Sequence, residues 1–144
     1  MSLRWLPDVN IWLALSLPDH VHHKKALEWM GADADPIFFC RASQQGLLRL
    51  LTTAAVLSPY KLAPLSNRQA LLRMREMLDA DRILMADEPL RIEPDWERFA
   101  SSVLASPKLW MDAYLAAFAI TGGYRIVTTD KGFKQFKGLN ALVL

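Results

Sequence analysis

Three aspartates, Asp8, Asp112 and Asp130, are the residues of this sequence best suited to chemistry. They lie far apart in the chain, yet each stands where an apolar, strand-like run meets a polar loop or the start of a helix. In a parallel α/β sheet such positions meet at one edge, beyond the carboxyl ends of the strands. Carboxylates brought close together repel one another unless a cation lies between them. The pattern therefore predicts a site for a divalent metal ion and, with it, phosphodiester chemistry.

The elements that would position these aspartates alternate between short apolar strands and helices. We expect strands near residues 3–6, 37–40, 90–92, 124–129 and 141–144. We expect helices near residues 10–17, 20–30, 43–51, 67–80, 94–104 and 111–120, and a short helical turn at 131–136. Asp19, Ser43 and either Ser66 or Asn67 are the expected helix caps. This alternation predicts an α/β fold with a short central parallel sheet flanked by helices.

Composition narrows the class of protein. The chain has 144 residues, of which 52% are apolar, and this suits a single domain over residues 1–144 with one core. We find neither an apolar run of the roughly 18 residues that cross a membrane nor a secretory leader. Cys40 is the single cysteine, which excludes an intramolecular disulfide and a CxxC metal site and fits a cytoplasmic protein. The net charge of +2 is too balanced to indicate nucleic-acid binding by itself.

Three segments together carry a resemblance to a known family. They are LPDVNIWLAL at residues 6–15, MDAYLAAFA at residues 111–119 and IVTTDKGF at residues 126–133. Their order and spacing resemble the PIN-domain ribonucleases, in particular the VapC toxins of bacterial toxin–antitoxin pairs, and the resemblance covers the whole chain. It implies a PIN-like three-layer α/β/α fold and an acidic cluster that holds Mg²⁺ or Mn²⁺ and cuts RNA. It also implies a homodimer that a VapB antitoxin neutralises.

Carried over by position, the resemblance assigns Asp8, Asp112 and Asp130 as the metal ligands and catalytic residues. The family usually has a further glutamate on the helix after the second strand, and Gln44 stands in the matching place here. A glutamine oxygen attracts a hard cation less than a carboxylate does. We therefore expect weaker metal binding than in a site with four acids.

Polar neighbours of the aspartates are placed to support them. Asn10 would hydrogen-bond Asp8 or the substrate, and Thr128 and Thr129 would orient Asp130. The competing interpretation is that the aspartates only favour a helix N-terminus or form turns. We prefer the metal site because all three aspartates match the family's spacing.

Basic residues near the acids are candidates for RNA contact. Lys131, Lys134 and Lys137 recur every third residue after the last aspartate, and Arg41 and Arg49 lie on the helix after the second strand. All five are candidates to hold RNA phosphates. A run of charge is also typical of a solvated surface, so this pattern alone does not decide between the two.

Two other features allow more than one interpretation. His20 and His23 are three residues apart and could share a helical face, but no third ligand for a zinc ion is evident. Trp12 lies in an apolar helix. It either packs in the core or forms a surface for a second subunit or an antitoxin helix.

The leading interpretation is a metal-dependent endoribonuclease that acts as a toxin, and two alternatives stand beside it. One is a catalytically weak PIN-like module that binds RNA or a partner, which Gln44 keeps open. The other is a phosphatase of the haloacid dehalogenase type, because the Asp8-Val9-Asn10 tripeptide resembles its opening motif. That chemistry requires a second aspartate where Asn10 stands, and the sequence has no late acidic pair.

Overall fold

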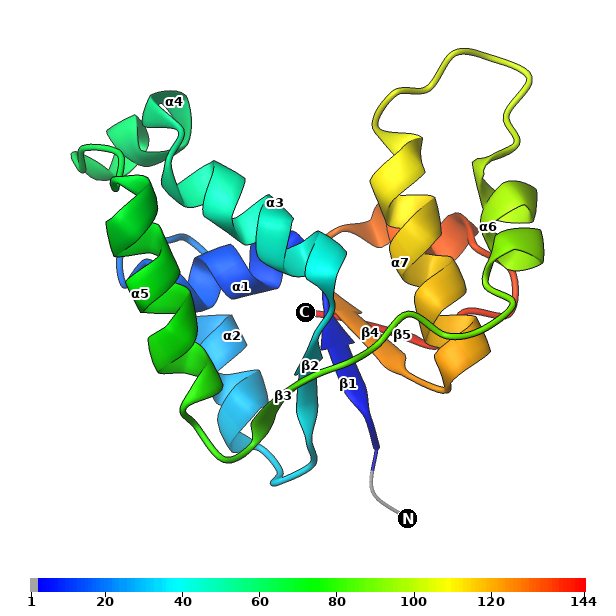
Figure 1. Cartoon of the computed structure of the whole chain (residues 1–144), viewed down its shortest axis with the longest axis horizontal. Helices are drawn as coiled ribbons and strands as arrows, with labels where there is room; N and C mark the ends of the chain where they lie inside the picture. Colours follow the sequence, from blue (N-terminus) through cyan, green and yellow to red (C-terminus); the bar gives the residue numbers. More distant parts are fainter. Residues whose placement is uncertain (1–2) are drawn as a thin grey trace.

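A computed structural model describes residues 3–144, and its centre is one parallel sheet. The five strands lie in the order β3-β2-β1-β4-β5 (Figure 1). They are β1 Trp5–Pro7, β2 Ile37–Phe39, β3 Ile83–Met85, β4 Arg125–Thr128 and β5 Ala141–Val143. Since every neighbouring pair is parallel, the carboxyl ends of all the strands lie at the same edge.

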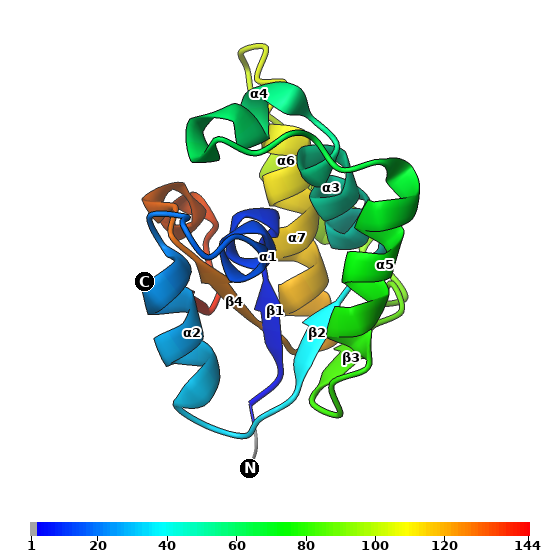
Figure 2. The same cartoon turned by 90° about the vertical axis from the view of Figure 1, so that its left-hand side faces the viewer.

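Helices cover both faces of this sheet. The α-helices are α1 Val9–Ser16, α2 His23–Gly31, α3 Arg41–Leu51, α4 Ala54–Leu57, α5 Asn67–Leu78, α6 Glu93–Ala100 and α7 Leu109–Gly122. Two 3-10 helices, η1 Ser58–Tyr60 and η2 Lys131–Gln135, complete the set. Figure 2 shows α1, α2 and α5 in front of the sheet and α7 behind it. The predicted three-layer α/β/α fold is therefore confirmed. Between residues 3 and 144, no helix is both long enough and apolar enough to span a bilayer.

Alternating side chains on the short strands build two apolar cores, one on each face of the sheet. On β1, Trp5 packs into the core beneath α1 and α2, while Leu6 packs into the core beneath α7. On β4, Val127 and Ile126 divide in the same way. Because side chains of a strand alternate between faces and helices cover both, these central strands are apolar at nearly every position.

Trp12 of α1 belongs to the first of these cores. Its side chain is fully buried, and its ring stacks on Phe39 of β2 with the ring centroids 3.6 Å apart. Of the two interpretations that the sequence left open for Trp12, core packing is therefore correct, because no part of this indole reaches the surface.

The strand expected at residues 90–92 is wrong. Residues 90 and 91 form a turn, in which Arg91 has a φ of 63° and so adopts a left-handed conformation that no strand accommodates. The third strand is β3 instead, at the edge of the sheet. This strand has three residues, and only Ile83 is buried. So short a strand with two exposed apolar residues shows no alternation of apolar and polar residues in the sequence. The next helix, α6, also ends at Ala100, four residues earlier than expected.

Two of the expected helix caps are also wrong. Asp19 lies in a turn, because α2 begins only at residue 23. Ser43 does not precede α3 but lies in its first turn, where its Oγ accepts the backbone N–H of Cys40 at 3.0 Å. The cap predicted at Ser66 is confirmed, since its side chain accepts a backbone N–H in the first turn of α5.

The close contact between α1 and α3 requires a glycine. A Cβ atom on Gly46 of α3 would lie 2.7 Å from Cγ2 of Val9 on α1. We therefore expect Gly46→Ala to lower the free energy of unfolding by about 1–3 kcal/mol through overpacking, measured by urea denaturation.

Gly31→Ala is the matched control for this substitution. A Cβ on Gly31, the last residue of α2, would meet no atom within 4 Å. We expect this variant to be as stable as the wild type or more stable by up to about 1 kcal/mol, because alanine restricts the unfolded chain. If the two variants were equally stable, α1 and α3 would not be packed as described.

Candidate acidic active site

The carboxyl ends of β1 and β4 form the natural crevice of this sheet. After β1 the chain adds β2 and β3 on one side, and later adds β4 and β5 on the other side of β1. Ligands of open parallel sheets bind at such a switch point, where neighbouring strands connect in opposite directions. Pro7 pairs with Val127 at the ends of the two strands, and the Asp8 N–H donates to the Val127 carbonyl at 2.9 Å. The first residues after β1 and β4 therefore lie side by side.

An open pocket of about 780 Å³ lies at this edge, between α1, α3 and the start of α7. The polar and aromatic residues that line it are Asp8, Asn10, Gln45, Arg49, Lys108, Trp110, Asp112, Asp130 and the buried Phe133. The structure thus brings the three predicted aspartates to one pocket from positions far apart in the sequence.

Asp8 is the most buried of the three, with only 4% of its surface exposed. It caps α1, and its Oδ1 accepts the Ile11 N–H at 3.0 Å. Its Oδ2 accepts the Thr128 hydroxyl at 2.5 Å. Burial raises the pKa of Asp8 to about 6, against the lowering effect of these two hydrogen bonds, and the charges of Asp112 and Asp130 raise it further.

Thr128 connects the first and last aspartates. Its hydroxyl donates to Asp8 and accepts the backbone N–H of Asp130 at 2.9 Å. The carboxylate of Asp130 in turn caps η2 by accepting the Gly132 N–H at 2.7 Å. A Cβ at Gly132 would lie 2.9 Å from that same carboxylate oxygen, so this tight turn favours glycine. The expected orientation of Asp130 by Thr128 thus acts on its backbone. Within the described residues 3–144, the side chain of Thr129 forms no hydrogen bond with Asp130.

Asp112 comes to the pocket from the first turn of α7. This helix is otherwise apolar on almost all sides, and residues 113 and 115–119 are buried. Because α7 leads directly into β4 and runs antiparallel to it, the start of α7 lies at the carboxyl edge of the sheet. Asp112 is half-buried there, and its pKa is raised by burial and, to a smaller extent, by the charge of Asp130.

The donor set fits a hydrated divalent ion. In the described part of the chain, no three side chains of His, Cys, Asp or Glu lie close enough to enclose one ion together. Likewise, no lysine or arginine of residues 3–144 forms an ion pair with the three aspartates. The repulsion among the three carboxylates is therefore not relieved by a direct ion pair. Mg²⁺ usually keeps several waters and binds through one or two carboxylates, so it does not require three of them around one ion.

Gln44 does not line the pocket. Its side chain is buried, with 3% exposed, and its Oε1 accepts the Arg41 guanidinium at 2.7 Å. Its neighbour Gln45 is exposed and lines the pocket instead. The amide at the predicted second acid position is thus already engaged by Arg41, and neither Gln44 nor Arg41 lines the pocket of the three aspartates.

Of the five predicted basic residues, Arg41 is engaged by Gln44, and the other four divide into two groups. Arg49 on α3 lines the pocket. Lys131, Lys134 and Lys137 are exposed on and after η2, but none of them lines it. RNA contact by these lysines therefore stays a prediction, at a surface beside the pocket.

Sequence reasoning missed three polar or aromatic residues on the pocket surface, Gln45, Lys108 and Trp110. Lys108 stands four residues before Asp112, which is about one helical turn, and this spacing was the signal that could have indicated it. Trp110 is a large aromatic residue that is exposed in the first turn of a largely apolar helix. Nothing in the periodicity of α7 distinguishes such a residue from a core residue.

His20 and His23 are engaged by nearby backbone groups. The Nδ1 atom of His20 accepts the His22 N–H at 3.0 Å, and that of His23 lies 2.7 Å from the Ala14 carbonyl. A zinc site at these histidines gains no support, because no further ligand of residues 3–144 joins them.

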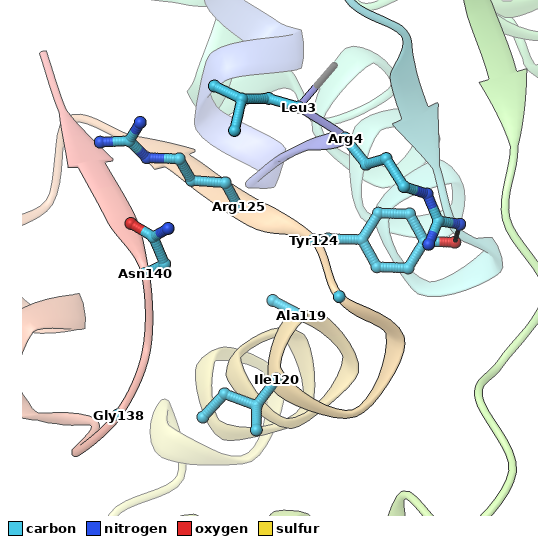
Figure 3. A pocket seen from close by; sticks show the side chains of 9 residues that line it. Leu3, Arg4, Ala119, Ile120, Tyr124, Arg125, Gly138 and Asn140 are labelled. Carbon is cyan, nitrogen blue, oxygen red and sulfur yellow. Dashed lines mark hydrogen bonds between the residues drawn. The ribbon is translucent and has the colours of Figure 1, made fainter. Parts of the chain in front are cut away.

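A second cavity, of about 340 Å³, lies at the opposite edge of the sheet (Figure 3). Arg4 and Tyr124 lie on one side of it, and Arg125 and Asn140 on the other. The Arg4 guanidinium donates to the Gly122 carbonyl at 2.8 Å and to the Tyr124 hydroxyl at 2.6 Å. Because these bonds join the end of α7 to β1 and no carboxylate lines the cavity, it has no part in the acidic site.

Comparison with known proteins gives the family. The profile of the PIN domain matches residues 6–139. This chain belongs to the PIN domain family. Ribonuclease VapC41 of Mycobacterium tuberculosis is 50% identical over 142 residues, which cover 96% of this chain and 97% of that protein. The resemblance to VapC-type PIN domains predicted from the sequence is confirmed.

Solved structures share this PIN fold at low sequence identity. VapBC2 from Rickettsia felis, crystallised with a promoter DNA fragment, aligns with a TM-score of 0.66 and 14% identity, and covers 98% of both chains. VapC20 of Mycobacterium tuberculosis, described as a toxin that cleaves the sarcin–ricin loop, aligns with a TM-score of 0.65 and 14% identity. It covers 91% of this chain and 93% of the VapC20 chain. At this identity the two structures establish the fold.

The buried Asp8 makes the stability of the metal-free PIN domain depend on pH. Its pKa is about 6 in the folded state and 3.8 ordinarily, so between these values the folded state holds a proton that the unfolded state has lost. The contribution of Asp8 to the free energy of unfolding is therefore fully present below about pH 4 and is lost as the pH rises to about 6, a change of about 3 kcal/mol.

Asp8→Asn removes the charge, so we expect this variant to be more stable than the wild type at pH 7. Urea unfolding in EDTA across this range measures it. The same pH dependence in both proteins would contradict the burial of a charged Asp8.

Proposed function

We propose that this protein is an endoribonuclease of the VapC type that cleaves RNA phosphodiester bonds with the help of Mg²⁺ or Mn²⁺. The observation that carries the proposal is the convergence of Asp8, Asp112 and Asp130 on one open pocket of a PIN domain. The 50% identity to a named ribonuclease over nearly the whole chain supports the same reaction.

Each aspartate has a distinct part in this proposal. Asp8 and Asp112 hold the metal ion, and Asp130 holds its water ligands or orients the attacking water. When bound, the ion supplies charge neutralisation at phosphorus and lowers the pKa of a water molecule. Thr128 keeps one lone pair of Asp8 occupied, which fixes the direction in which the remaining lone pairs point.

Two cations at the pocket are suited to hold the RNA backbone. Arg49 lies on α3, and Lys108 lies in the loop before α7. They lie in different elements that line the pocket, so they can bind phosphates that flank the one to be cleaved. Arg49 offers a planar fork of donors and Lys108 a point charge, and both are suited to phosphate oxygens.

We further propose that the protein is the toxin of a toxin–antitoxin pair, that it forms a homodimer and that a VapB-type antitoxin neutralises it. The solved VapBC complex with the same fold supports this partner class. The alternative is a PIN-like module that binds RNA or a partner without cutting. The engaged Gln44 favours it, because the pocket then has three carboxylates and no fourth acid.

Asp112→Asn tests the metal-dependent reaction. We expect RNA cleavage to fall by at least about 100-fold, more than for residues that only orient a metal ligand. We also expect Mn²⁺ to raise the thermal midpoint of the wild type but not of this variant, because a ligand that binds only the folded state stabilises it. Asp81→Asn, an exposed carboxylate just before β3, is the control and should retain both properties. Cleavage by the wild type that persists in EDTA would refute the mechanism, and metal binding without cleavage would support the non-catalytic module.

A salt titration tests the two cations. In the double variant Arg49→Ala/Lys108→Ala, the slope of log affinity against log salt concentration for single-stranded RNA should become shallower by about 1.4, or about 0.7 for each lost phosphate contact. The triple variant with alanine at Lys131, Lys134 and Lys137 is the comparison. A slope that changes only in the triple variant would move the RNA path away from the pocket and onto η2.

A further inference from the structure

Trp110 is an exposed tryptophan at the rim of the acidic pocket. Its side chain is 59% exposed, although tryptophan is usually among the more buried residues. It lines the acidic pocket together with the three aspartates and also a smaller recess of about 320 Å³ between α6 and α7. One indole thus forms the boundary between the candidate catalytic site and a neighbouring apolar hollow.

The side of Trp110 next to α6 is held in place. The Nε1 of Trp96 donates to the carbonyl of Trp110 at 3.3 Å, and the two rings meet edge to face with centroids 6.4 Å apart. Tyr114, one turn further along α7, packs edge to face against the same Trp96 ring, with the ring centroids 6.3 Å apart. Trp110 also lies in the first turn of α7, where no earlier helical turn covers it, and the preceding loop extends away from the sheet (Figure 1). The indole is therefore anchored on one side and open on the other.

We propose that Trp110 stacks against an unpaired base of the RNA substrate, next to the phosphate that lies at the three aspartates. This inference rests on the ribonuclease function proposed above and assigns to Trp110 the part of positioning the substrate. Proteins that bind unpaired RNA combine cations for the backbone with aromatic rings for the bases. Here Lys108 and Arg49 supply the cations and Trp110 the ring, all at one pocket.

The exclusion of double-stranded RNA follows from the same contact. In a duplex both faces of each base are already stacked on neighbouring bases, so a protein ring gains a base only when that base is unpaired. Trp110 therefore acts on the choice of substrate. The metal-binding carboxylates do not distinguish paired from unpaired RNA, since every nucleotide offers them the same phosphate.

Other exposed apolar residues nearby do not share this position. Val103 and Leu104 in the loop before α7 are 102% and 76% exposed, but neither lines the acidic pocket. Val103 is therefore a suitable control, because it is a fully exposed apolar side chain in the loop before α7 and does not line the acidic pocket.

Fluorescence anisotropy of a labelled single-stranded RNA of mixed sequence, measured in EDTA to prevent cleavage, tests the stacking. We expect Trp110→Ala to weaken binding by about 5- to 150-fold, Trp110→Phe to restore most of the affinity, and Val103→Ala to have no effect. Affinity for a fully paired duplex should not change in Trp110→Ala. Thermal unfolding checks that each variant is folded.

An abasic RNA gives a second test, in which the base is removed in place of the indole. Removing the base next to the cleaved phosphate should weaken wild-type binding by a similar factor, and Trp110→Ala should weaken it no further on that RNA. Additive losses, or unchanged affinity in Trp110→Ala, would overturn the inference. If Trp110→Ala instead lowered the molar mass in light scattering while RNA affinity stayed the same, the surface would be a subunit contact. A wild type that neither binds nor cleaves RNA would refute the proposed function itself.

Discussion

The hydrogen bond from Thr128 to Asp8 is the interaction on which the rest of the candidate site depends. It joins the ends of two neighbouring parallel strands and fixes a carboxylate that is almost completely buried. Burial of a carboxylate is unfavourable unless hydrogen bonds compensate it, and here Thr128 and the Ile11 N–H provide two. Even so, the pKa of Asp8 stays raised, because burial and two neighbouring acids outweigh these bonds. The charged form of Asp8 is therefore unfavourable in the metal-free protein, and a bound cation would stabilise it.

The two apolar cores hold the acidic residues in place despite this unfavourable charge. Both faces of the sheet are buried, so the strands that precede Asp8 and Asp130 are held by two cores. Helix α7 contributes almost only apolar contacts and one acid at its start. Close packing of α1 against α3 at Gly46 then places Arg49, less than one turn further along α3, at the same pocket. Charge and rigidity come from different residues, as expected where a site must be preorganised.

The sequence predicted the parts of this arrangement that follow from strand ends and interrupted patterns. Asp8 follows a short apolar run, and Asp112 interrupts an apolar helix, so both were visible without coordinates. The sequence did not show that the side chain of Gln44 points into the core, because the buried face of α3 depends on how the helix packs around Gly46. Lys108 lies in the loop just before α7, and only its spacing of four residues from Asp112 indicates that it turns toward the site. The edge strand at Ile83 was missed because three residues are too few to show alternation.

The distance along the chain between the partners of the central hydrogen bond has a consequence for synthesis. Asp8 directly follows the first strand to be synthesised and Thr128 is the last residue of the fourth, and the two residues are 120 positions apart. Contacts of such long range form late, after the entropy of closing the intervening loop has been overcome. Until β4 pairs with β1, Asp8 lacks its buried partner and Asp130 is not at the pocket. A nascent or truncated chain that ends before β4 therefore contains no partial version of the site, and the acidic centre is assembled in a single late step.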